Sequence, residues 1–340
     1  MKRRTFLKSA GLMAGGLAAS STAPGLMGAR AKAADKNGPT LWQGEGNDRP
    51  NILVIIVDQL RFPQGLFTQE IMDLAAPNLK GLREKSVSFD FHFAAAAMCS
   101  PSRSSMLTGL YTHQNGMFLT DAGSGFRASP SLNPGFPTWG SILNSADFGY
   151  NTYWWGKWHV STNDSTTPDY AQEYGFVDGG LPCPAPNTGL GMGLGVDPIT
   201  VSVFNDWLDR YTSAEETAPW CTTVSLTNPH DIAWFPNCTL GTPSQIQPGE
   251  DNPPSIFEQL PENFESWPEA LEQQGKPVLQ QAFVEVTDLQ GGFMPYQGDD
   301  PRFPEIWYQL LDLYVQVTGY VDRQIGTILE TINDEDTYPG

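Results

Sequence analysis

The segment NILVIIVDQ at residues 51–59 decides the fold class of this 340-residue chain. Its apolar centre is a β-branched run without polar alternation, which is typical of a strand buried on both faces of a mostly parallel sheet. The run ends in Asp58 and Gln59, a carboxylate and an amide. Because ligands bind at the carboxyl edge of open α/β sheets, we expect Asp58 and Gln59 to lie at a functional site.

Helices and further strands are expected to alternate along the rest of the chain. Apolar spacing and end signals predict helices at 77–85, 101–110, 138–148, 203–211 and 304–333. The residue pattern predicts strands at 86–93, 152–155 and 220–226. The stretches 161–200 and 232–300, rich in glycine and proline, are expected to be long surface loops. This order of elements predicts the α/β class, with a mostly parallel sheet flanked by helices.

Residues 1–33 resemble a twin-arginine (Tat) signal, which the Tat translocase reads to export folded proteins. Arg3 and Arg4 stand in a basic head, an apolar stretch follows, and small residues at 29–33 suit a signal peptidase. The alternative is an N-terminal membrane anchor, which the weak hydrophobicity and the glycines of the stretch disfavour. We therefore expect a periplasmic or secreted protein, with a linker at 34–49 and the catalytic domain from residue 50 onward.

Net charge narrows the classes of partner. The formal charge is −19, and loss of the leader, which holds six basic residues and no acidic one, would take it to about −25. Such a field repels nucleic acid and anionic membranes, so we expect neither nucleic-acid binding nor stable membrane association. An anionic substrate would need a local pocket built from the few cations present.

The four cysteines are Cys99, Cys183, Cys221 and Cys238. They form no CxxC pair, so the spacing does not indicate a zinc site. In an oxidising compartment the last three could include one disulfide, and the sequence leaves its pairing open.

Cys99 begins the run CSPSR at residues 99–103, at the start of a predicted helix. An anion at this place would face unpaired N–H groups and the positive end of the helix dipole. Arg103, one turn further on, can reach back to the same place. Both effects would lower the pKa of the thiol and make Cys99 a candidate nucleophile. The alternative is a buried or disulfide-bonded cysteine beside a surface arginine, and five residues alone do not decide between the two.

Five segments in the same order resemble motifs of the sulfatase family, in the alkaline phosphatase superfamily. The segment CSPSRSSMLTG at 99–109 matches the family signature C-x-P-S-R-x-S-x-L-T-G at every fixed position. The others are RPNILVIIVDQ at 49–59, APNL at 76–79, GKWH at 156–159 and NPH at 228–230. The resemblance implies an alkaline phosphatase-like fold and a sulfuric ester hydrolase.

The resemblance also implies a modified nucleophile. A formylglycine-generating enzyme would convert Cys99 into formylglycine (3-oxoalanine), whose aldehyde is hydrated to a geminal diol. One hydroxyl would attack the sulfur of a small-molecule or glycan sulfate ester and form a covalent sulfo-enzyme. The second hydroxyl would then lose a proton, and collapse of the diol would expel sulfate and restore the aldehyde.

The remaining roles fall on residues of matching chemistry. Asp58 and Gln59 supply oxygen ligands of the kind that Ca²⁺ prefers, with Mg²⁺ or Mn²⁺ as alternatives, and the modified Cys99 would complete this set. Arg103 and Lys157 would stabilise the developing negative charge. Two histidines are left for proton transfer, a step that suits their side-chain pKa. His159 is the candidate base for the second hydroxyl, and His230 is the candidate acid or sulfate contact.

The Asp58–Gln59 pair departs from the two aspartates that many sulfatases carry here. It resembles the branch that holds choline sulfatase-like enzymes and phosphonate monoester hydrolases. Sulfate and phosphorus esters are similar in size and shape, so a phosphonate monoester or phosphodiester hydrolase with the same nucleophile is the alternative to a sulfatase.

A second departure concerns the end of the sequence. The family adds metal ligands from a later strand, Asp followed by Asn or His, and a second lysine, and the sequence to Gly340 does not contain them. We therefore expect residues 50–340 to be an incomplete catalytic domain, truncated before the later core strands and a C-terminal subdomain, which binds metal weakly and turns over little. The third hypothesis is a non-catalytic remnant that binds sulfated glycans and keeps an unmodified Cys99.

Overall fold

The computed structural model describes residues 49–63, 67–120, 130–161, 170–178, 192–213, 218–230, 232 and 303–333. The chain divides into two compact units, residues 1–49 and residues 50–340, and the fold is that of the second. The predicted export signal and linker lie outside the described residues, as do Cys183, Cys238 and almost all of the loop expected at 232–300.

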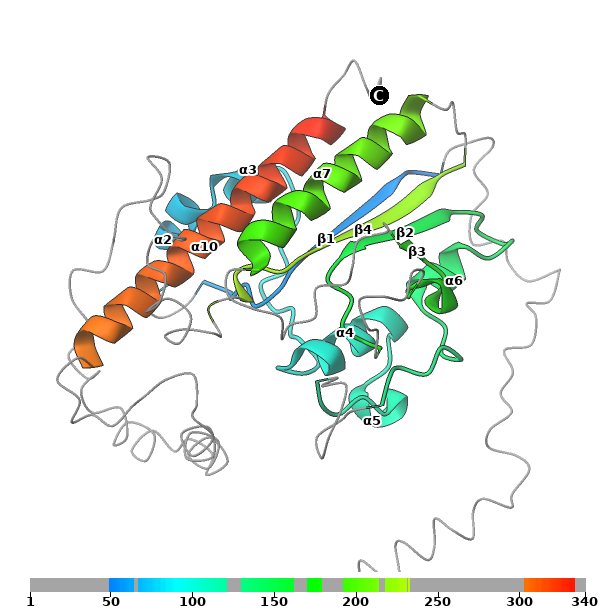
Figure 1. Ribbon diagram of the computed structural model, residues 1–340, viewed down its shortest axis with the longest axis horizontal. Helices are drawn as coiled ribbons and strands as arrows, with labels where there is room; N and C mark the ends of the chain where they lie inside the picture. Colours follow the sequence, from blue (N-terminus) through cyan, green and yellow to red (C-terminus); the bar gives the residue numbers. More distant parts are fainter. Residues whose placement is uncertain are drawn as a thin grey trace, which may run out of the picture. The chain divides into compact units, whose positions relative to one another are not determined.

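A four-stranded parallel sheet forms the centre of the described domain (Figure 1). The strand order is β1-β4-β2-β3, and every pair is parallel. The strands are β1 (Ile52–Val57), β2 (Asn151–Gly156), β3 (Val177–Asp178) and β4 (Trp220–Leu226). The three longer strands confirm the strands expected at 51–57, 152–155 and 220–226. The α/β class with a mostly parallel sheet is confirmed as well.

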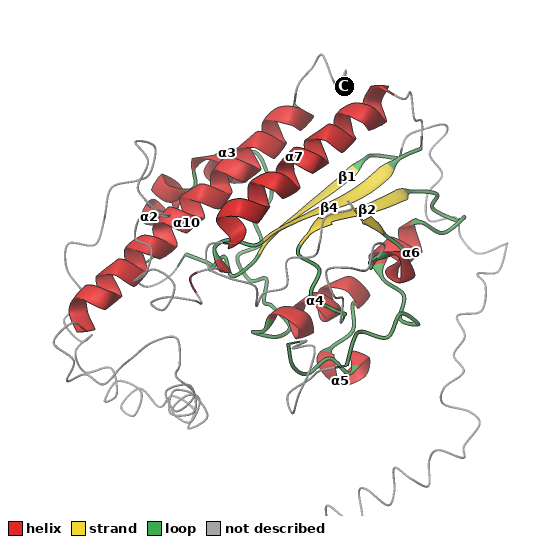
Figure 2. Ribbon diagram, in the orientation of Figure 1, coloured by secondary structure: helices red, strands yellow, loops and turns green. Residues whose placement is uncertain are grey.

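Helices cover both faces of this sheet, as Figure 2 shows. The helices are α2 (Gln69–Ala75), α3 (Pro77–Glu84), α4 (Cys99–Thr108), α5 (Thr112–Asn115), α6 (Trp139–Leu143), α7 (Met192–Ser213) and α10 (Phe303–Ile332). On one face, Val224 of β4 packs with Phe204 of α7 and Ile325 of α10. On the other face, Trp154 of β2 packs in a second core with Leu107 of α4. Alternate side chains of β1 and β2 therefore enter different cores, which explains the apolar run of β1 without polar alternation.

The long helix α10 holds the start of α3 in place. Asp322 of α10 is 0% exposed, and its carboxylate accepts the N–H groups of Asn78 and Leu79 at 3.0 and 2.8 Å. The Asn78 side chain donates to the same carboxylate at 2.9 Å. The first N–H groups of a helix have no partner within the helix, so a carboxylate there stabilises both these donors and the helix dipole. The segment APNL thus serves as a docking point for α10.

Two helices differ from their expected bounds. Helix α4 begins at Cys99 instead of residue 101, so Cys99 lies within its first turn. Helix α7 begins at Met192, eleven residues before the predicted start, inside a stretch expected to be loop. Glycine and Pro198 lower the helix propensity of that stretch, but burial of Thr200 and Val201 against the sheet overrides local preference.

The strand expected at 86–93 is wrong. The segment has no regular secondary structure, although its apolar residues alternate as in a strand. Val87, Phe89, Phe91 and Phe93 are between 77% and 87% exposed. An alternating pattern forms a strand only when a neighbouring strand accepts its hydrogen bonds, and no described strand pairs with this segment.

Among the described residues no helix combines the length and the apolar character that crossing a membrane requires.

Candidate active site

The first site residue stands at the carboxyl end of β1. Asp58 follows the strand directly, and its N–H donates to the Leu226 oxygen at 3.3 Å, which extends the β1–β4 pairing by one residue. Its carboxylate forms ion pairs with Lys157 and, at 3.4 Å, with Arg103. Burial raises the pKa of Asp58, but the two cations lower it by more, so the carboxyl pKa lies far below its ordinary value. Asp58 is therefore an ionised, largely buried carboxylate at any physiological pH.

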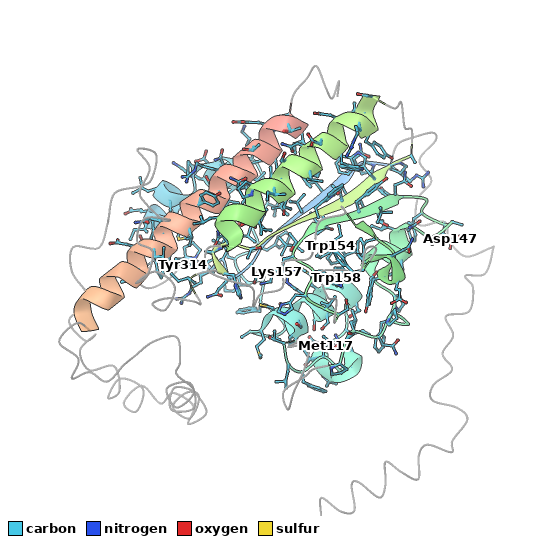
Figure 3. The ribbon with its side chains drawn as sticks, viewed as in Figure 1. Met117, Asp147, Trp154, Lys157, Trp158 and Tyr314 are labelled. Atoms are coloured by element: carbon cyan, nitrogen blue, oxygen red, sulfur yellow. The ribbon has the colours of Figure 1, made fainter. Side chains whose placement is uncertain are left out.

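Lys157, labelled in Figure 3, follows β2 directly, and its Nζ forms an ion pair with this carboxylate. Its side chain is 1% exposed, and its Nζ lies 3.9 Å from the Cys99 sulfur. The preceding Gly156 has φ +84°, and a Cβ there would lie 2.3 Å from the Ser225 oxygen. Glycine permits both this backbone conformation and the close approach to β4. The glycine of the GKWH segment thus allows the lysine to turn from the strand toward Asp58.

Arg103 joins the ends of three strands. Its Nη1 donates to the main-chain oxygen of Lys157 at 2.7 Å and to the Ser225 hydroxyl at 2.9 Å. Its Nη2 donates to Asp58 at 3.4 Å. The planar guanidinium has donors in several fixed directions, which a lysine lacks. Sequence analysis did not single out Ser225. The alternation of β4, which turns Ser225 to the face opposite Val224, was the signal that could have found it.

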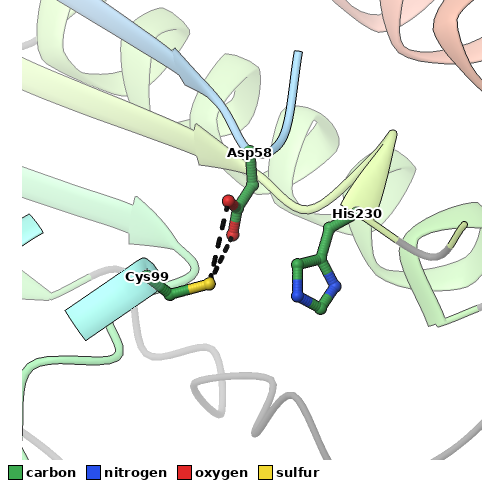
Figure 4. Close-up of side chains that lie close together, drawn as sticks. All are labelled: Asp58, Cys99 and His230. Carbon is green, nitrogen blue, oxygen red and sulfur yellow. Dashed lines mark hydrogen bonds between the residues drawn. The ribbon is translucent and has the colours of Figure 1, made fainter. Parts of the chain in front are cut away.

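Cys99 lies opposite Asp58, at the first turn of α4 (Figure 4). Its sulfur is 3.8 and 4.0 Å from the two carboxylate oxygens of Asp58. The expectation of a lowered thiol pKa is wrong: burial raises it, Lys157 lowers it, and Asp58 raises it again, so the pKa of Cys99 lies above its ordinary value. Burial and a carboxylate neighbour outweigh the cations. The unmodified side chain is thus a protonated thiol at neutral pH, which is a poor nucleophile.

His230 completes a group of three ligand side chains. One ligand atom each from Asp58, Cys99 and His230 lies within 4.8 Å of the others. The imidazole faces the other two side chains in Figure 4. Burial and Lys157 lower the pKa of His230 to about 4, although Asp58 opposes them. His230 is therefore a neutral imidazole at pH 7, with one nitrogen able to donate and one able to accept a hydrogen bond.

The two remaining predicted site residues, Gln59 and His159, both have a positive φ. Gln59 is exposed with φ +63°, and its main-chain oxygen accepts a 3.2 Å hydrogen bond from the hydroxyl of Tyr314. His159 is 5% exposed with φ +58° and does not belong to the group formed by Asp58, Cys99 and His230. Non-glycine residues rarely adopt such φ values, and those that do often stand at functional sites.

The three grouped side chains suit a divalent metal ion. A carboxylate oxygen and an imidazole nitrogen are common metal ligands, and the atom at the Cys99 position sets the character of the site. A thiolate there favours a soft metal, whereas oxygens of a hydrated aldehyde would favour a hard one such as Ca²⁺.

Other described tryptophan, histidine and cysteine side chains lie in the cores or on the surface. Trp155 and Trp158 are buried in the two cores, on opposite faces of the sheet. His92 and His113 are exposed. Cys221 is a buried free thiol, so it takes no part in a disulfide.

Known proteins resemble this chain in sequence and fold. The sequence model of the family described as Sulfatase matches residues 50–338. Choline-sulfatase of Rhizobium meliloti is 31% identical over 216 residues, which are 54% of this chain and 39% of that protein. Human arylsulfatase D is 36% identical over 129 residues, 36% of this chain and 21% of its own length. The chain therefore spans well under half the length of these curated relatives.

A solved structure shows the same fold. The phosphonate monoester hydrolase of Agrobacterium radiobacter superposes with a TM-score of 0.51 at 20% identity, over 85% of this chain and 60% of that one. The alkaline phosphatase-like arrangement expected from the sequence motifs is thereby confirmed.

Proposed function

Because the chain belongs to the sulfatase family, we propose that it supplies the nucleophile and the anion-binding cations of a sulfuric ester hydrolase. One observation carries the proposal: Cys99, at the first turn of α4, lies 3.8 Å from Asp58 and 3.9 Å from Lys157. Lys157 and Arg103 are nearly fully buried and face the same point. A strongly acidic protein thus keeps two desolvated cations where an anionic ester would meet the nucleophile.

The nucleophile is proposed to be formylglycine, made from Cys99 by a separate formylglycine-generating enzyme. The raised thiol pKa supports this, because an unmodified Cys99 would supply little thiolate at neutral pH. One hydroxyl of the hydrated aldehyde attacks the sulfur and displaces the alcohol of the ester. Loss of a proton from the second hydroxyl then expels sulfate and restores the aldehyde.

Five residues of the chain act around this group. Lys157 and Arg103 stabilise negative charge on the sulfate oxygens as the ester bond breaks. His230, neutral at pH 7, donates an N–H hydrogen bond to the ester as the acid or sulfate contact. His159 is the proposed base for the second hydroxyl. Asp58 anchors both cations and keeps their ammonium and guanidinium groups aimed at the ester.

A divalent metal ion, Ca²⁺ or alternatively Mg²⁺ or Mn²⁺, is part of the proposal. Asp58 and the oxygens of the modified Cys99 would hold it, with His230 beside them and Gln59 as the further ligand expected from the sequence. The ion would neutralise charge on the bound ester.

The proposal also covers the class of ester that is hydrolysed and the localisation of the protein. Sulfate esters are favoured by the family, and phosphonate monoesters are the alternative because the Asp58–Gln59 pair resembles that branch. A non-catalytic role as a binder of sulfated glycans is the third hypothesis. Export to the periplasm or beyond by the Tat translocase follows from residues 1–33, with the modification installed before export.

Paired assays test the function. The natural full-length protein, made together with a formylglycine-generating enzyme, is given an aryl sulfate and an aryl phosphonate monoester. We expect hydrolysis of the sulfate to exceed that of the phosphonate and to vanish in Cys99→Ala. Cys221→Ala is the matched control, since that thiol is buried in β4 away from the site. A preference for the phosphonate would select the alternative, and hydrolysis of neither would reject both enzymes.

A further inference from the structure

We propose that Asp197 of α7 is a positioning residue, which sets the place of His230 by holding the backbone that leads to it. The role of His230 in the reaction rests on the proposed function, whereas the positioning itself does not. Asp197 touches none of the grouped residues Asp58, Cys99 and His230 in any contact described above. It acts through two residues of the segment that follows β4.

The carboxylate of Asp197 binds two successive backbone N–H groups. Its Oδ1 accepts from Thr227 at 2.6 Å, and its Oδ2 accepts from Asn228 at 2.9 Å. Asp197 itself is 0% exposed. Hydrogen bonds to an ionised acceptor are shorter and stronger than neutral ones, and one carboxylate with an oxygen for each donor fixes two peptide planes at once.

These two N–H groups depend on Asp197 because the sheet ends before them. Strand β4 stops at Leu226, whose oxygen accepts the N–H of Asp58 in the final hydrogen bond of the β1–β4 pair. Thr227 and Asn228 are buried, at 5% and 0% exposure, so water does not replace a lost acceptor. Buried backbone donors are almost always paired, and the helix α7 provides the acceptor here.

The held segment leads to His230 by a tight turn. The N–H of His230 donates to the Thr227 oxygen at 3.1 Å, so the orientation of the Thr227 peptide sets where the next three residues run. The imidazole then lies within 4.8 Å of the ligand atoms of Asp58 and Cys99. A shift of the Thr227 peptide would therefore move the imidazole relative to Cys99.

A carboxylate suits this task where an amide does not. An asparagine at position 197 has one oxygen and one NH₂ group, so its NH₂ would face one of the two backbone donors. We expect Asp197→Asn to keep the size of the side chain and to release one of the two N–H groups. Asp197→Glu keeps both oxygens but moves them outward along the longer side chain.

A matched control exists in the same domain. Asp322 of α10 is equally buried, at 0% exposure, and it also accepts two successive backbone N–H groups, from Asn78 and Leu79. Those residues start α3, and none of the contacts that build the site involves them. Asp322→Asn should therefore lower thermal stability much as Asp197→Asn does, without moving His230.

NMR spectra of the histidine side chains test the position of the His230 imidazole directly. The sequence has four histidines, so ¹H–¹³C spectra of the imidazoles are sparse, and the His230 signal is the one that disappears in His230→Gln. We expect this signal to shift or broaden in Asp197→Asn and to stay unchanged in Asp322→Asn. An unchanged signal in a folded Asp197→Asn protein would overturn the proposal. If that variant does not fold, Asp197→Glu is read in the same way and decides it.

A double-mutant cycle measured in kcat separates the failure of this proposal from the failure of the proposed function. If the natural protein hydrolyses the aryl sulfate, Asp197→Asn should lower kcat on the order of tenfold while KM changes little, and it should add no further loss in the His230→Gln background. If the losses of kcat in the two single variants multiply in the double variant, the two residues act independently and the proposal is overturned. If the signal moves but His230→Gln leaves kcat unchanged, the positioning stands and the proposed role of His230 fails.

Discussion

Arg103 donates a 2.7 Å hydrogen bond from Nη1 to the main-chain oxygen of Lys157, and the side chains of both residues bind the same carboxylate of Asp58. Three segments far apart in the sequence, the end of β1, the first turns of α4 and the end of β2, are joined by this contact. The two cations are held by the backbone and by Asp58 together, so they keep their place before any anion arrives. Preorganised charge of this kind needs no rearrangement during the reaction.

Replacement of this arginine by lysine should be strongly destabilising. Arg103→Lys loses the donors to the Lys157 oxygen and to Ser225, and it leaves Asp58 with a weakened partner in a buried place. We expect a loss of about 3–5 kcal/mol in the free energy of unfolding, measured by urea titration. Arg83→Lys is the control, because the Arg83–Asp73 pair is partly exposed and should contribute about 1 kcal/mol or less. Equal small losses in both variants would contradict the described contacts.

Stability should fall in mild acid because of His230. Its pKa is about 4 in the folded protein against about 6.5 in the unfolded chain, so between these values the unfolded state binds the proton and the folded state does not. The stabilisation is complete above pH 6.5 and is lost as the pH falls toward 4. The loss amounts to at most about 3 kcal/mol, less where solvent screens the site.

The measurement is the midpoint of thermal unfolding at a series of pH values for the natural sequence and for His230→Gln. The difference between the two curves should widen between pH 6.5 and 4.5. Parallel curves over that interval would show that His230 titrates normally.

Gly156 should tolerate no side chain. In Gly156→Ala the new Cβ would meet the Ser225 backbone oxygen at 2.3 Å, at a φ of +84°. Strain and overpacking should cost about 1–3 kcal/mol or more, and the shift should displace Lys157. Gly81→Ala in α3 is the control, since a Cβ there has no neighbour within 4 Å. That change should stabilise the protein by up to about 1 kcal/mol, and both effects are read by chemical denaturation. A neutral Gly156→Ala would refute the close approach of β2 and β4.

The hydroxyl of Tyr314 should support the turn that carries Asp58. It accepts the N–H of Arg61 at 2.8 Å and donates to the Gln59 oxygen at 3.2 Å. Tyr314→Phe should lower the free energy of unfolding by about 1–3 kcal/mol and weaken divalent-metal binding, which isothermal titration would measure. In the control, Tyr150→Phe, one hydrogen bond to the Pro50 oxygen is lost at the other end of β1. Equal metal affinity in Tyr314→Phe and the natural protein would count against this support.

Local sequence patterns predicted the strands of the central sheet correctly. They were wrong where tertiary contacts determine whether a segment forms a strand or a helix. The strand at 220–226 has the predicted bounds, and every one of its residues is buried, so its lack of charged side chains reflects its surroundings directly. The segment 86–93 carries an equally regular pattern and forms no strand, because strand formation requires a neighbour that the pattern does not specify. The start of α7 was missed for the opposite reason, since tertiary packing outweighs its glycines and Pro198.

The residues of the site were likewise predicted where local sequence determines their position and missed where distant contacts do. Motifs singled out Asp58, Cys99 and Arg103, which the structure brings together, because a short spacing and a strand end fix them locally. Ser225 and Asp197 were missed because their roles come from contacts with residues more than a hundred and about thirty positions away. The thiol pKa was predicted with the wrong sign, since the sequence shows the neighbouring cations but not how deeply Cys99 is buried.

Peptide mass spectrometry across residues 98–103 tests the central claim most directly. The protein is purified after production with a formylglycine-generating enzyme, and a second sample is made without it. We predict that Cys99 in the first sample has lost its sulfur and carries an aldehyde that reacts with a hydrazide probe, whereas Cys221 keeps its thiol. An intact thiol at Cys99 in both samples would contradict the account and favour a protein that binds without catalysis.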